Sequence, residues 1–209
     1  MKIQIISRLS GAVLFEHEAE RNTVALTLVA AVKARVNLTD ARLDGANLSD
    51  ARLDGAKLIG ANLYGASLVG ANLDGASLVG ANLTDARLDG AKLDGARLVG
   101  ANLTDALLDG ASLVGANLDG ANLDGEILNK APISLLNLHW PVLITSQYMR
   151  IGCQRHTHKE WGAFTNREIK SMAPGAISFW RKWKAPLLAI CHANHEGPAD
   201  APLAEKVVA

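Results

Sequence analysis

A five-residue pattern of apolar and polar positions fills the middle of the chain. From Ala41 to Gly125, 17 consecutive blocks read Ala-x-Leu-x-Gly or Ala-x-Leu-x-Asp. An imperfect block at 36–40 precedes them and a degraded block at 126–130 follows, which makes 19 blocks over 95 residues. A period of five fits neither the 3.6 residues of a helical turn nor the two-residue alternation of a long strand.

Each block predicts a short extended side that ends in a corner. Alanine and leucine stand two residues apart, so they share one face of an extended segment. Glycine at the fifth position permits a positive φ, and aspartate is the next most tolerant residue where a turn must form. Asp50, Asp85 and Asp105 each follow Ser or Thr and indicate a second turn variant. One side cannot bury its leucine alone, so the blocks must coil and stack as a solenoid.

Residues 1–35 predict a cap on the first coil. An uncapped solenoid end exposes leucine side chains and unpaired strand edges, so a cap is expected on physical grounds. The alternation of apolar residues predicts a small hairpin, and Asn22 or Thr23 can cap a short helix. The expected elements are strands at 2–6 and 12–17 and a helix at 24–35.

Residues 131–195 predict a C-terminal domain that contains helices. Short strands are expected at 133–138, 142–144 and 148–152. Thr165 and Glu168 have capping-box spacing, which predicts a helix over 166–172. The Pro- and Ala-containing segment 196–209 predicts a disordered tail.

A longer helix is predicted after residue 175. Apolar residues recur there at intervals of four, three, four and three, from Ala176 to Ile190, with a kink expected near Pro186. Trp180, Trp183 and Leu187 lie on this apolar stripe. They are interpreted either as cap or core contacts or as contacts with a second copy of the chain.

The blocks closely resemble the pentapeptide-repeat family, whose pattern is A(D/N)LXX. Residues 71–75, Ala-Asn-Leu-Asp-Gly, are representative, and the resemblance covers residues 36–130. The flanking segments are similar to those of phage, prophage or bacterial members. The resemblance implies an all-β solenoid, a right-handed quadrilateral β-helix with four blocks per coil. Nineteen blocks would then make about 4.75 coils, with the central Leu and the preceding Ala pointing inward.

The implied geometry stacks residues that are 20 positions apart and so predicts columns on the outside. Ile59, Val79 and Val99 would form an apolar stripe, and we interpret them as a candidate interaction surface. Their simpler interpretation is that β-branched residues suit stacked strands. A second column would be acidic, either a recognition surface or a solvated face, and comprises Asp54, Asp74 and Asp94.

The balance of basic and acidic residues differs between the three segments of the chain. The 209 residues contain 21 Lys and Arg and 21 Asp and Glu, so the formal net charge is zero. Residues 1–35 carry five basic and three acidic residues, 36–130 carry seven and 13, and 131–209 carry nine and five. A balanced chain with an acidic coil gives no electrostatic reason to expect direct binding to nucleic acid.

The sequence also argues against a membrane-spanning protein and against a disulfide-rich protein. Two cysteines are too few for a disulfide framework. The apolar stretch at 11–15 is too short for a signal-peptide core, and that at 24–32 is far below the roughly 20 residues that span a bilayer. We therefore expect a cytoplasmic protein without a membrane partner.

Two clusters of cysteine and histidine are the candidate metal ligands. Tetrahedral zinc prefers such side chains, and a four-ligand site would be structural rather than catalytic. The alternative, which we favour, is buried thiols and surface histidines, with no metal and no cofactor. The ligands of this zinc hypothesis are Cys153, His156, Cys191 and His195.

No catalytic motif is present, so the sequence does not predict an enzyme. It predicts a non-enzymatic protein-interaction scaffold that presents flat solenoid faces to an unknown partner. The family resemblance implies an alternative, because some members are DNA-like binders of DNA gyrase that inhibit it or protect it from quinolones. A zinc-stabilised C-terminal module is a second alternative, and a homodimer stays open.

Overall fold

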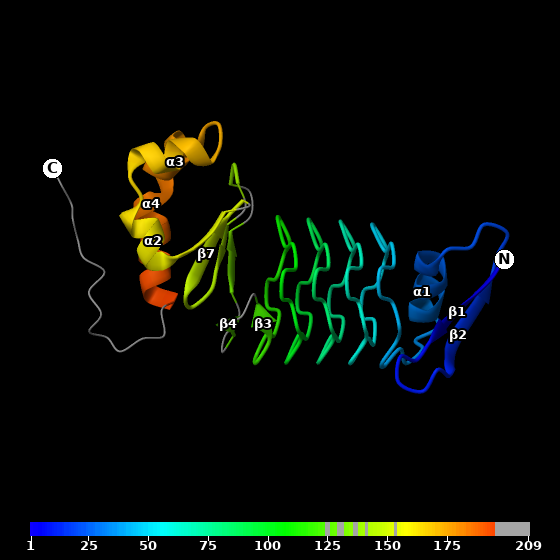
Figure 1. Cartoon of the computed structure of the whole chain (residues 1–209). Helices are drawn as coiled ribbons and strands as arrows, with labels where there is room; N and C mark the ends of the chain where they lie inside the picture. The colour runs from blue at the N-terminus through cyan, green and yellow to red at the C-terminus, as the bar shows by residue number, and fades with distance from the viewer. Residues whose placement is uncertain (124–125, 129–131, 136–137, 141, 153, 195–209) are drawn as a thin grey trace. The chain divides into compact units, whose positions relative to one another are not determined.

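The computed structural model describes the chain except for residues 124–125, 129–131, 136–137, 141, 153 and 195–209 (Figure 1). The chain divides into two compact units, Met1–Ser134 and Leu135–Ala209. The first contains the repeats, and the second contains a small sheet and three helices. No helix in the described ranges is both long and apolar enough to cross a bilayer.

The repeats coil with a period of 20 residues. Parallel bridges join residues 20 apart, from Asn37 and Lys57 at one end to Asn102 and Asn122 at the other. Four blocks therefore make one turn, as Figure 1 shows for the successive coils. The central leucines from 38 to 123 are buried, and so are the first alanines of the blocks from 41 to 121 except Ala46, which is half-buried; this confirms the predicted inward positions.

Backbone hydrogen bonds explain why such short extended sides are stable. The N–H of Leu58 donates to the carbonyl of Ser77 in the next coil at 2.8 Å, and Ser77 N–H donates back to Ala56 at 2.8 Å. The N–H of Ala61 closes the corner by donating to Leu58 within the same coil at 3.1 Å. Each block thus satisfies its backbone polar groups through its neighbours above and below, without a long strand.

The corners adopt left-handed backbone conformations. The corner glycines have positive φ, and so do the aspartates that replace glycine at Asp40, Asp50, Asp85 and Asp105, with φ between 56° and 58°. Aspartate tolerates this region better than most residues because its short side chain can form local hydrogen bonds. The predicted corners at these aspartates are therefore confirmed, but their φ lies in the same region as that of the glycine corners and does not mark a second turn variant.

A hairpin and a helix cover the N-terminal end of the coil (Figure 1). β1 (Lys2–Ile6) pairs antiparallel with β2 (Val13–Glu18), and α1 (Val24–Lys33) packs against both strands. Thr23 is the N-cap of α1, and its hydroxyl accepts the N–H of Leu26 at 3.1 Å. The bounds of these elements lie within two residues of the predicted hairpin and helix.

The hairpin also continues the coil's hydrogen bonding. Ser7 bridges Ala41 antiparallel, and Arg42 N–H donates to the carbonyl of Ile6 at 2.8 Å. The hairpin therefore pairs one side of the first coil, at residues 40–42, which removes part of a template for aggregation.

The C-terminal end of the repeats departs from the expected continuation. β3 (Asn122–Leu123) pairs antiparallel with β4 (Glu126–Ile127), so the degraded block folds back on the block before it. Among the described residues, the parallel bridges end at Asn102 and Asn122. The sequence offers a reason, because this block has glutamate where the others have inward alanine, and burying an unpaired carboxylate there would be costly.

The four-stranded sheet has the order β5–β6–β7–β8, and its strands β6, β7 and β8 belong to the second unit. The strands are β5 (Ile133–Leu135), β6 (Val142–Ile144), β7 (Tyr148–Ile151) and β8 (Gln154–Thr157). The helices are α2 (His158–Ala163), α3 (Asn166–Met172) and α4 (Ala176–Asn194). The predicted bounds of β6 and α3 are confirmed, whereas β8 and α2 were not predicted.

Two capping boxes begin the short helices. The Glu160 carboxylate accepts the N–H and hydroxyl of Thr157, each at 2.8 Å, and Thr157 Oγ1 accepts the N–H of Glu160 at 3.2 Å. Thr165 and Glu168 repeat the arrangement at the start of α3. These donors lower the pKa of both carboxyls below the ordinary value. The spacing Thr-x-x-Glu at 157–160 was thus the missed sequence signal for α2.

Candidate interaction faces of the coil

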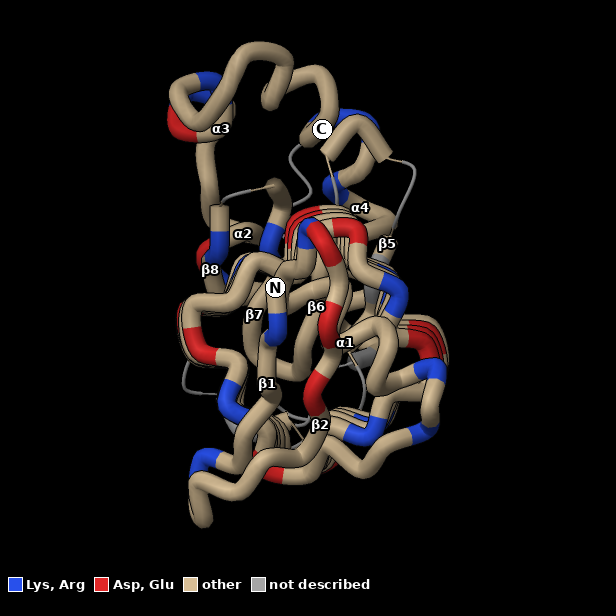
Figure 2. The backbone as a smooth tube through the Cα atoms, turned by 90° about the vertical axis from the view of Figure 1, so that its right-hand side faces the viewer, with Lys and Arg blue, Asp and Glu red and all other residues tan. Residues whose placement is uncertain are grey.

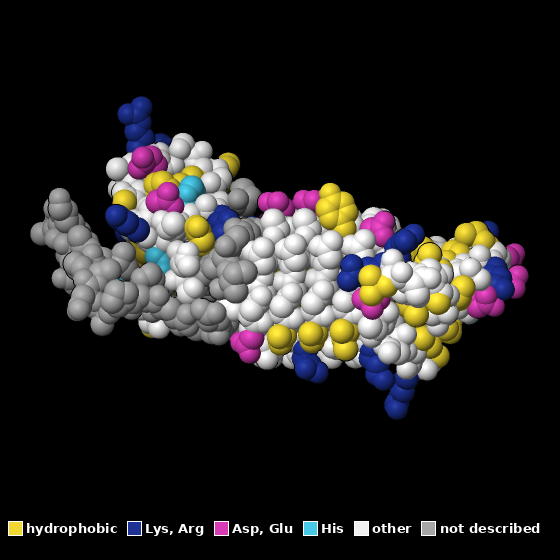
Figure 3. Space-filling model, turned by 60° about the horizontal axis from the view of Figure 1, so that its bottom comes forward, with side chains coloured by type: hydrophobic (Ala, Val, Ile, Leu, Met, Phe, Trp, Pro, Cys, Tyr) yellow, Lys and Arg dark blue, Asp and Glu magenta, His cyan; other side chains and the backbone are white. Residues whose placement is uncertain are grey.

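The apolar stripe lies along one face of the coil. We call this the stripe face and define it by the blocks 56–60, 76–80 and 96–100. Ile59 is 41% exposed, and Val79 and Val99 are half-buried. Backbone hydrogen bonds from the corner glycines fix this register. The N–H of Gly60 donates to the carbonyl of Val79 at 2.8 Å, and the N–H of Gly80 donates to the carbonyl of Val99 at 2.9 Å. A row of hydrophobic side chains along the coil is visible in Figure 3.

Two cations accompany the stripe. Lys57 and Arg97 stand two residues before Ile59 and Val99, and bridges through Ser77 hold them in register. Both side chains are exposed, and neither forms an ion pair with a described residue. The stripe face is therefore apolar along one edge and basic along the other.

Sequence reasoning missed these two cations, although a signal existed. Every Lys and Arg between 41 and 125 precedes the central leucine of its block, whereas every Asp follows it. Elsewhere on the coil this order creates local pairs, such as Arg52 with Asp54 at 3.9 Å and Arg87 with Asp89 at 3.7 Å. In the blocks of Lys57 and Arg97 the position after leucine is apolar, so neither cation has a carboxylate in its own block, and Asp119 follows Val99 only in the next coil.

The acidic column lies on a second face, which we call the acidic face and define by the blocks 51–55, 71–75, 91–95 and 111–115. Asp94 N–H donates to the Asp74 carboxylate at 3.0 Å, and Val114 N–H donates to the Asp94 carboxylate at 3.2 Å. Seen along the coil axis in Figure 2, acidic residues of successive coils superpose. These carboxylates therefore help to hold neighbouring coils together as well as facing solvent.

The C-terminal unit places the three predicted contact residues differently. Trp180 is 3% exposed and Leu187 is fully buried, so both belong to the core of this unit. Trp183 is half-buried, and the Lys182 ammonium lies 5.3 Å from its ring centroid. Of the three, Trp183 alone keeps substantial accessible surface for a contact with a second copy, which remains a prediction.

The zinc hypothesis is tested only in part, because Cys153 and His195 lie outside the described residues. His156 lies in β8, edge-on to Trp161 and Phe164, with ring centroids 5.2 and 4.8 Å away. Cys191 is buried in α4, and its thiol donates to the Met149 sulfur at 3.8 Å. Burial raises the pKa of Cys191 to about 12 in the metal-free chain. The described residues contain no group of three His, Cys, Asp or Glu placed to hold a metal ion.

The sequence of the coil matches a known protein family. The family profile of pentapeptide repeats (8 copies) matches residues 34–68, 66–105 and 86–125. A solved pentapeptide repeat protein from Nostoc Pcc 7120 is 36% identical, with the match covering 53% of this chain and 88% of that one at a TM-score of 0.42. No curated protein matches the chain.

Two further solved structures are pentapeptide repeat proteins. One, from the cyanobacterium Cyanothece 51142, is 37% identical over 41% of this chain and 55% of its own, with a TM-score of 0.32. The other, from the thylakoid lumen of Arabidopsis thaliana, is 32% identical over 41% and 63%, with a TM-score of 0.27. The chain thus spans less than two thirds of either. From the repeat match and the identity to the Nostoc protein, this chain belongs to the pentapeptide repeat family, whose members fold as right-handed quadrilateral β-helices.

Proposed function

We propose that the chain is a non-enzymatic scaffold that binds another protein through the stripe face. Pentapeptide repeat proteins are generally structural or interaction proteins rather than enzymes. The observation that carries the proposal is the pairing of three apolar side chains in register with two cations that lack partners among the described residues.

Physical considerations support this face over the others. Isolated exposed apolar residues are common on proteins, but a contiguous row on a rigid surface is typical of binding sites. The coil's backbone is held by hydrogen bonds on both sides, so little conformational entropy is lost when a partner docks.

The free charges of Lys57 and Arg97 favour an acidic partner. Opposite charges at the rim of an apolar contact steer association and fix register. The partner we expect is an extended segment that carries apolar side chains for the stripe and carboxylates for the two cations.

Site-specific photo-cross-linking tests this proposal. A photoreactive amino acid replaces Lys57 on the stripe face or, as the control, Lys92 on the acidic face. Both residues are exposed lysines, so the two replacements match in exposure and in the positive charge that they remove. In cells that express the chain natively, we expect a protein adduct from position 57 and none from position 92. Equal adducts, or adducts at position 92 alone, would contradict the proposal.

A second candidate is binding to DNA gyrase by mimicry of DNA, and the acidic column favours it. The coil has 13 acidic against seven basic residues. The column is sparser than DNA, however, because duplex DNA carries one negative charge per about 1.7 Å while coils stack at about 4.8 Å. We expect no effect on gyrase supercoiling or on its quinolone sensitivity at micromolar protein. An effect that is lost when Asp54, Asp74 and Asp94 are changed to asparagine would support this candidate instead.

A further inference from the structure

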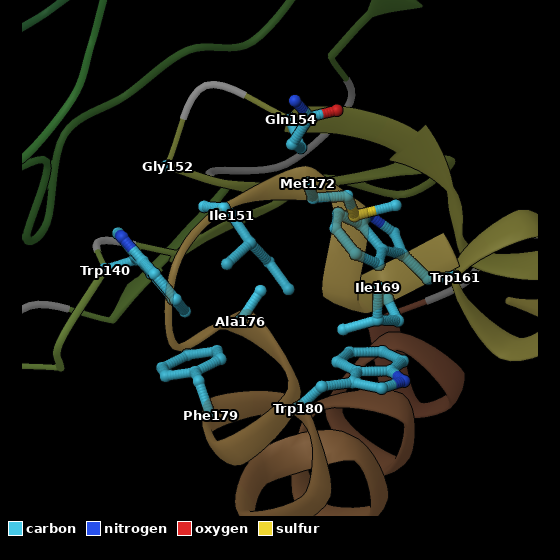
Figure 4. Close-up of a pocket in the computed structure, with 11 residues that line it drawn as sticks. Trp140, Ile151, Gly152, Gln154, Trp161, Ile169, Met172, Ala176, Phe179 and Trp180 are labelled. Carbon is cyan, nitrogen blue, oxygen red and sulfur yellow. The ribbon is translucent and has the colours of Figure 1, made fainter. Parts of the chain in front are cut away.

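A cavity of about 100 Å³ opens within the C-terminal unit, where β7 and β8 meet helices α2, α3 and α4 (Figure 4). Four aromatic side chains form two of its sides. Trp140 and Phe179 lie on one side and Trp161 and Trp180 on the other, with the small side chain of Ala176 between them.

The aromatic rings are held in place by their own contacts. Trp140 and Phe179 pack edge to face with centroids 5.1 Å apart, and Trp161 and Trp180 pack at 5.2 Å. The indole N–H of Trp161 donates to the Met149 carbonyl at 2.5 Å. Rings that are fixed in this way cannot easily move to fill the space between the two pairs.

The lining determines which chemistry can enter. No described residue that lines the cavity is titratable, and the polar groups of the lining are the Gln154 amide and the indole N–H groups, of which that of Trp180 is buried without a hydrogen-bond partner among the described residues. A charged ligand would lose its hydration without gaining a partner, so an uncharged one is required. An apolar cavity of about 150 Å³ is known to hold benzene, so the smaller volume of about 100 Å³ here limits a guest to no more than a single ring.

We propose that this cavity binds an uncharged compound through one aromatic ring. Aromatic walls favour an aromatic guest over an aliphatic one of equal size, because ring edges and faces attract each other. Trp140 and Gln154 are half-buried at the rim, which leaves room for a substituent on the bound ring to reach solvent.

The position of Ala176 supports a ligand site rather than incomplete packing. It lies three and four residues before Phe179 and Trp180 on α4, so its side chain points with theirs toward the cavity. A leucine there would fill space that is now open and bury more apolar surface. Protein interiors contain few spaces larger than a water molecule, so this one is unusual.

Titration of the full-length, isotope-labelled protein with phenol tests the proposal, with cyclohexanol as the non-aromatic control. The indole N–H resonances are the readout, because three of the four tryptophans line the cavity and Trp183 does not. We expect phenol to shift the signals of Trp140, Trp161 and Trp180, with a Kd of about 1 mM or lower, and to leave Trp183 unchanged. Cyclohexanol should bind about tenfold more weakly or worse.

Blocking variants complete the test. Ala176→Leu should abolish the phenol shifts and raise the melting temperature, whereas Ala189→Leu, at an exposed position of the same helix, should do neither. Met172→Phe at the cavity rim is the second blocking variant should Ala176→Leu not fold. Absent phenol shifts, equal binding of cyclohexanol, or unchanged binding in a folded blocking variant would each overturn the proposal.

Discussion

Asp40 and Gly60 occupy stacked corners of the first two coils, and the Asp40 carboxylate fills the space that a side chain at position 60 would need. A Cβ built on Gly60 would lie 2.5 Å from Asp40 Oδ1, which is closer than real contacts allow. The same carboxylate pairs with Arg8 of the N-terminal cap at 3.6 Å. The corner therefore joins the cap to the coil.

Gly60→Ala should destabilise the coil more than Gly80→Ala. Both glycines have φ of 63°, but nothing lies within 4 Å of a Cβ at Gly80. Gly80→Ala should cost about 1–2 kcal/mol from backbone strain alone, and Gly60→Ala should cost more because it also displaces the Asp40 carboxylate from Arg8. Urea unfolding followed by far-ultraviolet circular dichroism measures the difference.

A double variant separates the two effects. Asp40 itself has φ of 58°, a conformation that glycine adopts without strain. In an Asp40→Gly background, Gly60→Ala should therefore lower the free energy of unfolding by no more than Gly80→Ala does in the native chain. Equal losses in the two single variants would show that the clash is relieved without cost.

The C-terminal unit should lose stability in acid. The N–H and hydroxyl groups of Thr157 and Thr165 lower the pKa of Glu160 and Glu168 below the ordinary value of 4.5 in the folded state. Protonation thus favours the unfolded chain, so this stabilisation is complete above pH 4.5 and is lost as the pH falls through the lowered values.

Tryptophan fluorescence during urea unfolding reports on this unit, because all four tryptophans lie after residue 134. Glu160→Gln with Glu168→Gln should flatten the acid-dependent loss, because it removes the two carboxyls whose pKa values the Thr157 and Thr165 donors lower. An unchanged pH dependence in the double variant would rule out the capping boxes as its source.

Cys191 should resist thiol reagents in the folded protein. Its pKa of about 12 leaves almost no thiolate at pH 8, and the thiolate is the reactive form. In a Cys153→Ser background, a chromogenic disulfide reagent should label Cys191 only after guanidinium is added. Equal labelling rates in native and unfolded protein would contradict its burial.

The surroundings of Cys191 predict the outcome of a metal analysis. Its thiol donates to the Met149 sulfur, and no group of three His, Cys, Asp or Glu among the described residues is placed to hold a metal ion. Purified protein should contain much less than one zinc per chain. A stoichiometric zinc content that falls in Cys191→Ala would instead support the zinc-stabilised module.

The repeat could be predicted from the sequence because it is local and self-consistent. Each five-residue block contains its own inward alanine, inward leucine and corner residue. Even the aspartate corners could be recognised, because aspartate tolerates a positive φ. The last block is the exception, since its pairing depends on what can stack on it rather than on its own pattern.

The C-terminal unit was harder to predict because its sequence has no repeat that extends from one element to the next. β8 has the sequence Gln-Arg-His-Thr, which shows no apolar alternation, although it lies in the sheet. The aromatic cavity joins Trp140 to residues on α4 that are about 40 positions away, a proximity that no spacing rule provides. The missing ion-pair partners of Lys57 and Arg97 also depend on the register of the coils.

A comparison of co-purifying proteins tests the role of the stripe face most directly. Val79→Asp places a charge in the middle of the stripe, and Val114→Asp places the same charge on the acidic face, where Val114 is 65% exposed. Both positions follow a central leucine, so the coil should tolerate both. We predict that at least one protein co-purifies with the native chain and with Val114→Asp but is lost with Val79→Asp. The same proteins bound to all three chains would contradict binding through the stripe face.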